Sequence, residues 1–210
     1  MKRILIFVLA VFCAITTWAW PGGLGYKTPD LQMMQAKGNV KYIKFDHPLL
    51  ASCFKSGICY FDKNGWIDVN QTCFSKTTVE RNGKWQLVGM YREYEAFTDE
   101  SDFPLGCSSE WLYNSSGLVT KIVGYEWEWV DTKIYIYDEE DVVVEMRMDW
   151  SDSSGGGAEI YYYSNYTYDS YGNWISRDVV LEEKYYDLDG SCEGTEYKEY
   201  VETRTIVYYE

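Results

Sequence analysis

The chain has 210 residues, a formal net charge of −14 and an aromatic content of 18%. So acidic a chain is repelled by phosphate backbones, which excludes nucleic acid as a partner. The aromatic content argues against disorder, and the length suits one domain with a single core.

The first 19 residues have the pattern of an export signal. Lys2 and Arg3 precede an apolar run of about 12 residues, and Thr17-Trp18-Ala19 offers a cleavage site. An N-terminal membrane anchor is the alternative, but the run is shorter than the ~20 residues of a spanning helix. We therefore predict a signal peptide at 1–19 and a mature chain that has no membrane span. It would be periplasmic, cell-surface or secreted.

Residues 20–36 form a lead-in segment, in which we expect one helical turn over Leu31–Ala36. From residue 37 to 210, apolar and polar side chains alternate with period 2, which is typical of half-buried strands. Val144, Met146, Met148 and Trp150 would face one way, and Val143 the other. The pattern predicts a single all-β domain, an antiparallel meander of about ten strands.

A short sequence motif recurs between these strands. An aromatic residue is followed by Asp or Asn and, three positions later, by Gly, in copies that begin at Phe61, Tyr113, Tyr137, Tyr168 and Tyr186. The copy at Tyr137 has Asp141 in place of Gly, and a weaker sixth copy covers 79–85. The Asx side chain closes a turn on its own backbone and Gly supplies a positive φ. The expected turn residues are Asp62, Gly65, Asn114, Gly117, Asp138, Asp169, Gly172, Asp187 and Gly190.

Hairpin repeats of this kind predict an open, strongly curved sheet or an incomplete barrel. Two stretches rich in small or acidic residues, 98–106 and 149–157, are expected to be flexible loops.

The best copy, Tyr166 to Trp174, resembles the Y-x-Y-D-x-x-G-[RN]-[LW] unit of the YD repeats of Rhs-type proteins. Tyr135 to Asp138 matches the first half of that unit, and 36–43 is similar to the lead-in of small exported bacterial proteins with degenerate units. The resemblance implies a repeat-built β-sheet in a secreted or cell-envelope protein. It implies no established activity for such small members.

Catalytic and metal signatures are weak. The single histidine, His47, precedes Pro48 and is typical of a turn, and paired carboxylates have no local signature. Asp187-x-Asp189-Gly190 resembles part of a calcium loop but also an ordinary hairpin turn. We predict no catalytic residue, metal or cofactor. Five cysteines follow the signal, with their pairing left open: Cys53, Cys59, Cys73, Cys107 and Cys192.

Aromatic strands are the more informative surface. Rings bordered by carboxylates can stack on sugars, although cross-strand packing in the core is the competing explanation. Adjacent residues in Tyr161–Tyr163 must point to both faces, so some rings should be exposed. The candidate ligand-binding residues are Tyr125, Trp127 and Trp129, expected on one face, with Tyr161 and Tyr163.

These features favour a non-enzymatic exported binding or scaffold module of the bacterial cell envelope, with carbohydrate or an envelope protein as its partner. Two alternatives remain at this point. One is an outer-membrane β-barrel, which alternation and aromatic residues also suit. The other is a carboxylate-dependent hydrolase.

Overall fold

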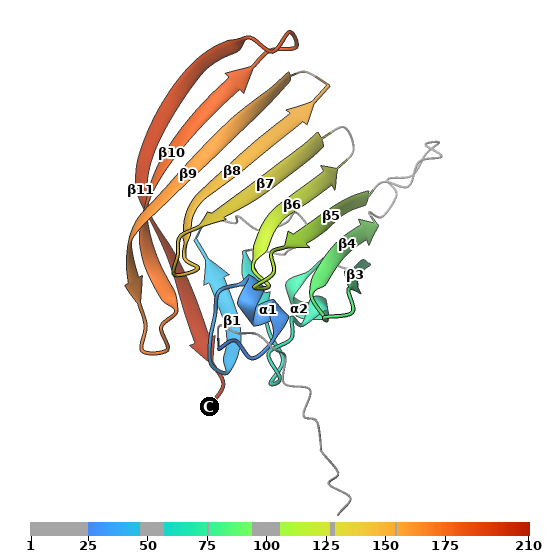
Figure 1. Ribbon diagram of the computed structural model, residues 1–210. Helices are drawn as coiled ribbons and strands as arrows, with labels where there is room; N and C mark the ends of the chain where they lie inside the picture. The colour runs from blue at the N-terminus through green and yellow to red at the C-terminus, as the bar shows by residue number, and fades with distance from the viewer. Residues whose placement is uncertain (1–24, 47–56, 75, 94–105, 127–128, 154) are drawn as a thin grey trace, which may run out of the picture.

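Figure 1 shows the computed structural model, which describes residues 25–46, 57–74, 76–93, 106–126, 129–153 and 155–210. The signal peptide at 1–19, His47, Cys53 and Trp127 lie outside the described residues, as does nearly all of 98–106.

One curved antiparallel sheet dominates the fold (Figure 1). Its eleven described strands follow the order β2-β1-β11-β10-β9-β8-β7-β6-β5-β4-β3, and β2 and β3 form its two edges, so the sheet is not closed into a barrel. The all-β meander in an open curved sheet is therefore confirmed. The strands are β1 (Val40–Phe45), β2 (Ile58–Tyr60), β3 (Thr77–Arg81), β4 (Leu87–Glu93), β5 (Gly106–Tyr113), β6 (Val119–Glu126), β7 (Trp129–Tyr137), β8 (Val143–Asp152), β9 (Gly155–Tyr168), β10 (Trp174–Tyr186) and β11 (Cys192–Tyr208).

The described residues contain two short helices, α1 (Pro29–Met33) and α2 (Val69–Thr72). Helix α1 starts earlier than the predicted turn over Leu31–Ala36, because the Thr28 hydroxyl accepts a hydrogen bond from Leu31 N and Pro29 occupies the first turn. Helix α2 contacts both edge strands, β2 and β3.

The predicted turns are confirmed in detail. In the turn at Asp169, the carboxylate Oδ1 accepts hydrogen bonds from the backbone N–H groups of Tyr171 and Asn173, both at 2.9 Å. Gly172 has a φ of 75°, and its N–H donates to the Asp169 carbonyl at 3.0 Å. This geometry is a tight turn with a bulge at the left-handed residue. Equivalent backbone bonds close the turns at Asp62, Asn82, Asn114, Asp138 and Asp187.

Two copies show that the motif tolerates residues other than Gly. Asp141 takes the left-handed position of its turn with a φ of 63°, as Asp can. In the weak copy, Asn82 is the Asx residue and Trp85, at a φ of 60°, occupies the place of Gly. Gly83 is therefore not the equivalent of Gly172.

Four of these turns, after β3, β5, β7 and β9, lie at the same end of the sheet, because successive strands alternate in direction. The N-terminal segment 25–39 crosses that end and binds the turns. Gln32 Nε2 donates to the Ser116 carbonyl at 2.7 Å, and Lys37 N donates to Asn173 Oδ1 at 2.6 Å. We call this end the base. Residues 25–36 of the predicted lead-in segment therefore belong to the folded structure, because they contact the turns at the base.

The main core fills the base. Buried side chains of the N-terminal segment, β1 and β2 pack against those of β4, β5 and β6, with Trp111 2% exposed and Ile122 2% exposed. A second cluster lies on β8, β9 and β10 and includes Met146, Tyr161 and Val179. The face of the sheet that carries both clusters is called the inner face.

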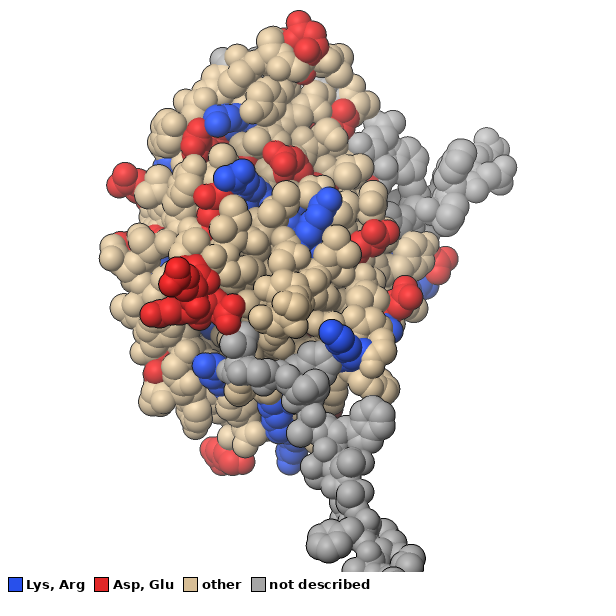
Figure 2. All heavy atoms as spheres, in the orientation of Figure 1, with Lys and Arg blue, Asp and Glu red and all other residues tan. Residues whose placement is uncertain are grey.

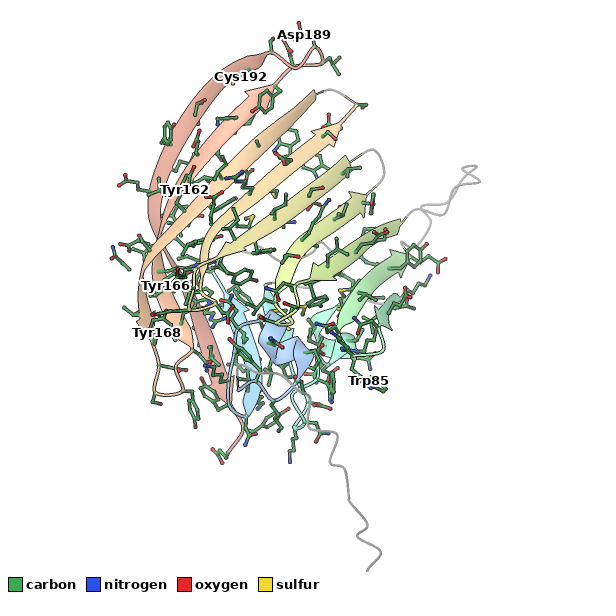
Figure 3. The ribbon with its side chains drawn as sticks, viewed as in Figure 1. Trp85, Tyr162, Tyr166, Tyr168, Asp189 and Cys192 are labelled. Atoms are coloured by element: carbon green, nitrogen blue, oxygen red, sulfur yellow. The ribbon has the colours of Figure 1, made fainter. Side chains whose placement is uncertain are left out.

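Beyond the base, β7 to β11 continue as an extended part of the sheet, whose far tip carries Asp189 and Cys192 in Figure 3, opposite the end where Trp85 lies. We call this part the upper sheet. It comprises 129–133, 148–152, 155–161, 181–186 and 192–198.

The predicted flexible loop at 149–157 is wrong, because β8 runs to Asp152 and β9 begins at Gly155. The glycines serve packing rather than flexibility. A Cβ atom on Gly157 would lie 2.5 Å from the indole of Trp150 on the neighbouring strand. Val143 was predicted on the face opposite Met146, and this prediction is also wrong. A β-bulge opposite Ile136 and Tyr137 shifts the register, so that Val143 and Met146 are both buried in the core.

Candidate functional site

A row of three glycines and three larger residues crosses the inner face of the sheet from β6 to β11. Its members are directly opposite one another on six neighbouring strands. The row runs Gly124, Asp131, Trp150, Gly157, Tyr185 and Gly194. Because glycine has no side chain, Asp131 and Trp150 can lie flat across their neighbours: a Cβ on Gly124 would be 2.3 Å from Asp131 Oδ1.

Trp129 completes this surface. It lies two residues before Asp131 on β7, and its ring stacks on that of Trp150 with 4.7 Å between centroids and 7° between planes. Trp129 is 37% exposed. The pair therefore forms a rigid, partly solvent-exposed aromatic platform supported by Gly157.

The next row toward the base is mostly charged over β7 to β11, with Met148 between Lys133 and Glu159, and is called the polar row. It includes Lys133, Glu159, Glu183 and Glu196, with Glu159 directly opposite Glu183 and Glu183 opposite Glu196. Like charges directly opposite one another destabilise a sheet, so three neighbouring glutamates lower the stability of this one. Their presence therefore indicates a role other than stabilising the fold. They concentrate hydrogen-bond acceptors beside the aromatic platform.

Cations and a hydroxyl group hold these carboxylates in place. Lys133 Nζ lies 2.6 Å from Asp131 Oδ2, Lys198 pairs with Glu183, and the Tyr161 hydroxyl donates to Glu159. Burial and the hydrogen bond to Glu159 raise the pKa of Tyr161, so this hydroxyl remains a donor at neutral pH. The site thus presents oriented carboxylates and ammonium groups next to an indole face.

The structure separates the aromatic residues that the sequence grouped together. Tyr125 and Trp129 do not share a face, because β6 ends at Glu126 and β7 begins at Trp129, which places Tyr125 opposite Val130 on the outer face. The expectation that Tyr125 and Trp129 lie on one face is therefore wrong. Tyr125 remains 41% exposed, away from the Trp129 platform.

Tyr161 and Tyr163 lie on the inner face and are buried, whereas Tyr162 between them is 40% exposed on the outer face. The expectation that this run points both ways is confirmed. The rings of Tyr161 and Tyr163 are stacked with 6.3 Å between centroids, so contacts with other side chains cover most of their surface. Only the hydroxyl of Tyr161 reaches the polar row.

Sequence reasoning missed Trp150, Asp131, Glu159 and Glu183 as site residues. The alternation through Met148 and Trp150 placed Trp150 on the correct strand face, but the glycines after it suggested a loop. Without the pairing of β8 with β9, the platform on Gly157 could not be recognised.

The remaining sequence candidates have structural roles. The carboxylate of Asp187, which suggested a calcium loop, accepts backbone N–H groups within its own turn, as the carboxylate of Asp62 does in the equivalent turn. Among the described residues, no group of three His, Cys, Asp or Glu side chains is arranged to hold a metal. Cys59, Cys73 and Cys107 are buried thiols, and Cys192 is an exposed one.

A scan against protein-family models and a search of curated proteins both found no match to this chain. Neither of the helices in the described part of the chain is long and apolar enough to cross a membrane. Any functional assignment must therefore come from the geometry of the inner face.

Proposed function

We propose that this chain is a non-enzymatic, exported binding module of the bacterial envelope, and that the inner face of the upper sheet binds carbohydrate. The observation that carries the proposal is the Trp129–Trp150 pair, whose rings are stacked with 4.7 Å between centroids and whose Trp150 indole lies against Gly157. The C–H face of a sugar ring can cover an exposed indole and exclude water from it.

The polar row supplies the second half of such a site. Glu159 and Asp131 can accept hydrogen bonds from sugar hydroxyl groups, and Lys198, whose side chain is 53% exposed, can donate to ring or hydroxyl oxygens. Lys133 and Glu183 are buried and orient Asp131 and Lys198 through their ion pairs. Because these side chains are already held by ion pairs and by Tyr161, little conformational entropy would be lost on binding.

The outer face supports the proposal by contrast. It also exposes apolar residues, including Leu112, Ile134 and Tyr197, but Lys121 and Arg147 lie beside them in the same row of the sheet. Figure 2 shows acidic and basic side chains distributed among uncharged residues over the visible surface. Such a surface is typical of a solvated face.

A screen of the purified protein on a glycan array tests the proposal. Wild type should bind a restricted set of glycans, Trp129→Ala should lose that binding, and Tyr197→Ala should retain it. Tyr197 is a suitable control because it is 67% exposed on the outer face. Equal binding by Trp129→Ala would refute the inner-face site.

The same screen separates binding from hydrolysis. Glu159 and Glu183 are opposed carboxylates, the arrangement that the hydrolase alternative requires. A binding module leaves a bound oligosaccharide intact, so the appearance of new reducing ends during incubation would overturn the non-enzymatic assignment.

A further inference from the structure

A partly open cavity of about 80 Å³ lies between the N-terminal segment and the inner face of the sheet. It is separate from the Trp129 platform. Apolar walls come from Phe45, Trp111 and Val119, among others, and Gln35 is a polar lining residue. Since one water occupies roughly 30 Å³ in the liquid, the cavity has room for more than one water molecule or for a small organic molecule.

Three charged side chains line this cavity, and they do not balance. Arg177 Nε donates to Glu202 Oε2 at 2.6 Å, which forms a buried ion pair. Arg204 is 4% exposed, and it donates hydrogen bonds to the backbone carbonyls of Met34, Gln35 and Trp174. Two guanidinium groups against one carboxylate leave one positive charge in excess.

That excess charge has an electrostatic consequence within the fold. Burial and the nearby positive charge of Arg177 lower the pKa of Arg204 below its ordinary value. An uncompensated buried cation is costly, and a negative charge placed near it would recover part of that cost.

One hydroxyl group at the cavity also lacks a partner. Tyr163 is 6% exposed and lines the cavity, and its hydroxyl makes no hydrogen bond with the described residues. The Arg177 guanidinium lies against the face of its ring, with Cζ 3.5 Å from the centroid. An orphaned buried donor beside an open volume indicates a missing acceptor.

From these features we propose that the cavity is a binding site for a small aliphatic carboxylate. Its carboxylate group would accept the Tyr163 hydroxyl hydrogen bond and offset the excess positive charge of Arg177 and Arg204. Its short hydrocarbon part would pack against Trp111, Phe45 and Val119. The cavity volume limits such an anion to a few carbon atoms.

Thermal unfolding of the purified protein with propionate as the probe tests this proposal. Propionate should raise the melting temperature saturably, whereas neutral propionamide, or chloride at the same ionic strength, should not. Tyr163→Phe removes only the hydroxyl group, so the variant should fold at least as stably as wild type but bind propionate about tenfold more weakly. Tyr162→Phe, on the outer face, should behave as wild type.

Three results would overturn the proposal: equal stabilisation by propionate and propionamide, equal propionate affinity in Tyr163→Phe, or a crystal structure soaked in propionate that shows only water in the cavity. The Trp129→Ala variant should bind propionate normally. The carboxylate site and the carbohydrate site can therefore succeed or fail independently.

Discussion

The base and the upper sheet are built from the same antiparallel strands, yet different interactions hold them. In the base, the segment 25–39 contacts residues distant in sequence through buried hydrogen bonds, such as those that Asp30 accepts from Arg81 and that Arg204 donates to Met34. In the upper sheet, glycines lie opposite large side chains and the ion pairs are partly exposed. The comparison teaches that the base provides stability and leaves the upper inner face available for binding.

The largest expected difference concerns buried charge in the base. Asp30 is fully buried, accepts two hydrogen bonds from Arg81 at 2.6 Å and one from Ile67 N. Asp30→Ala leaves these donors unpaired and should cost about 3 kcal/mol of unfolding free energy, measured by urea denaturation.

The matched change in the upper sheet is Lys198→Ala, whose side chain is 53% exposed. It should cost less unfolding free energy than Asp30→Ala, because the Lys198 ammonium group is exposed and its interaction is screened by solvent. Similar costs for both variants would contradict the division of the molecule into a stable base and an accessible upper sheet.

The next largest effect on stability is expected at Gly157, which lies beneath the Trp150 indole. Gly157→Ala places a Cβ 2.5 Å from the Trp150 indole, so it should destabilise the fold by about 1–3 kcal/mol and weaken glycan binding. Gly194 lies in the same row with nothing within 4 Å of its Cβ position, and Gly194→Ala is the control. If the two variants melt alike, Trp150 does not rest on Gly157.

The repeated turns predict a smaller effect. Gly172 has a φ of 75°, and Gly172→Val should destabilise the fold by more than ~1 kcal/mol because β-branched residues are disfavoured there. Asp141→Gly makes the reverse change at the equivalent position and should raise the melting temperature slightly. An unchanged melting temperature in Gly172→Val would rule out the turn geometry.

The smallest effect concerns acid stability. Burial alone would raise the pKa of Asp169, but hydrogen bonds from Tyr208, Asn173 and Tyr171 outweigh it and lower the pKa. A carboxylate whose pKa is lower in the folded than in the unfolded protein stabilises the fold at pH values above its unfolded-state pKa, which is near 4. This stabilisation is lost as the pH falls through the folded-state pKa. Melting curves of Asp169→Asn should therefore vary less with pH below about 4 than those of wild type.

Local chemistry made the turns predictable from sequence, since Asp or Asn and a left-handed residue define each one. The hairpin between Glu126 and Trp129 was missed because it has no Gly, Pro or Asn signal. Contacts such as Arg204 with Met34 join residues 170 positions apart, and no local pattern encodes them. The platform and the cavity depend on such pairings, so the sequence could suggest aromatic binding but not its location.

The central claim, that the inner face of the upper sheet is the binding surface, is tested most directly by calorimetric titration with the strongest glycan from the array. We predict that Trp129→Ala weakens binding at least about tenfold, the loss of one well-packed aromatic contact. Tyr197→Ala should bind like wild type. Unchanged affinity in Trp129→Ala, or a loss confined to Tyr197→Ala, would contradict the account.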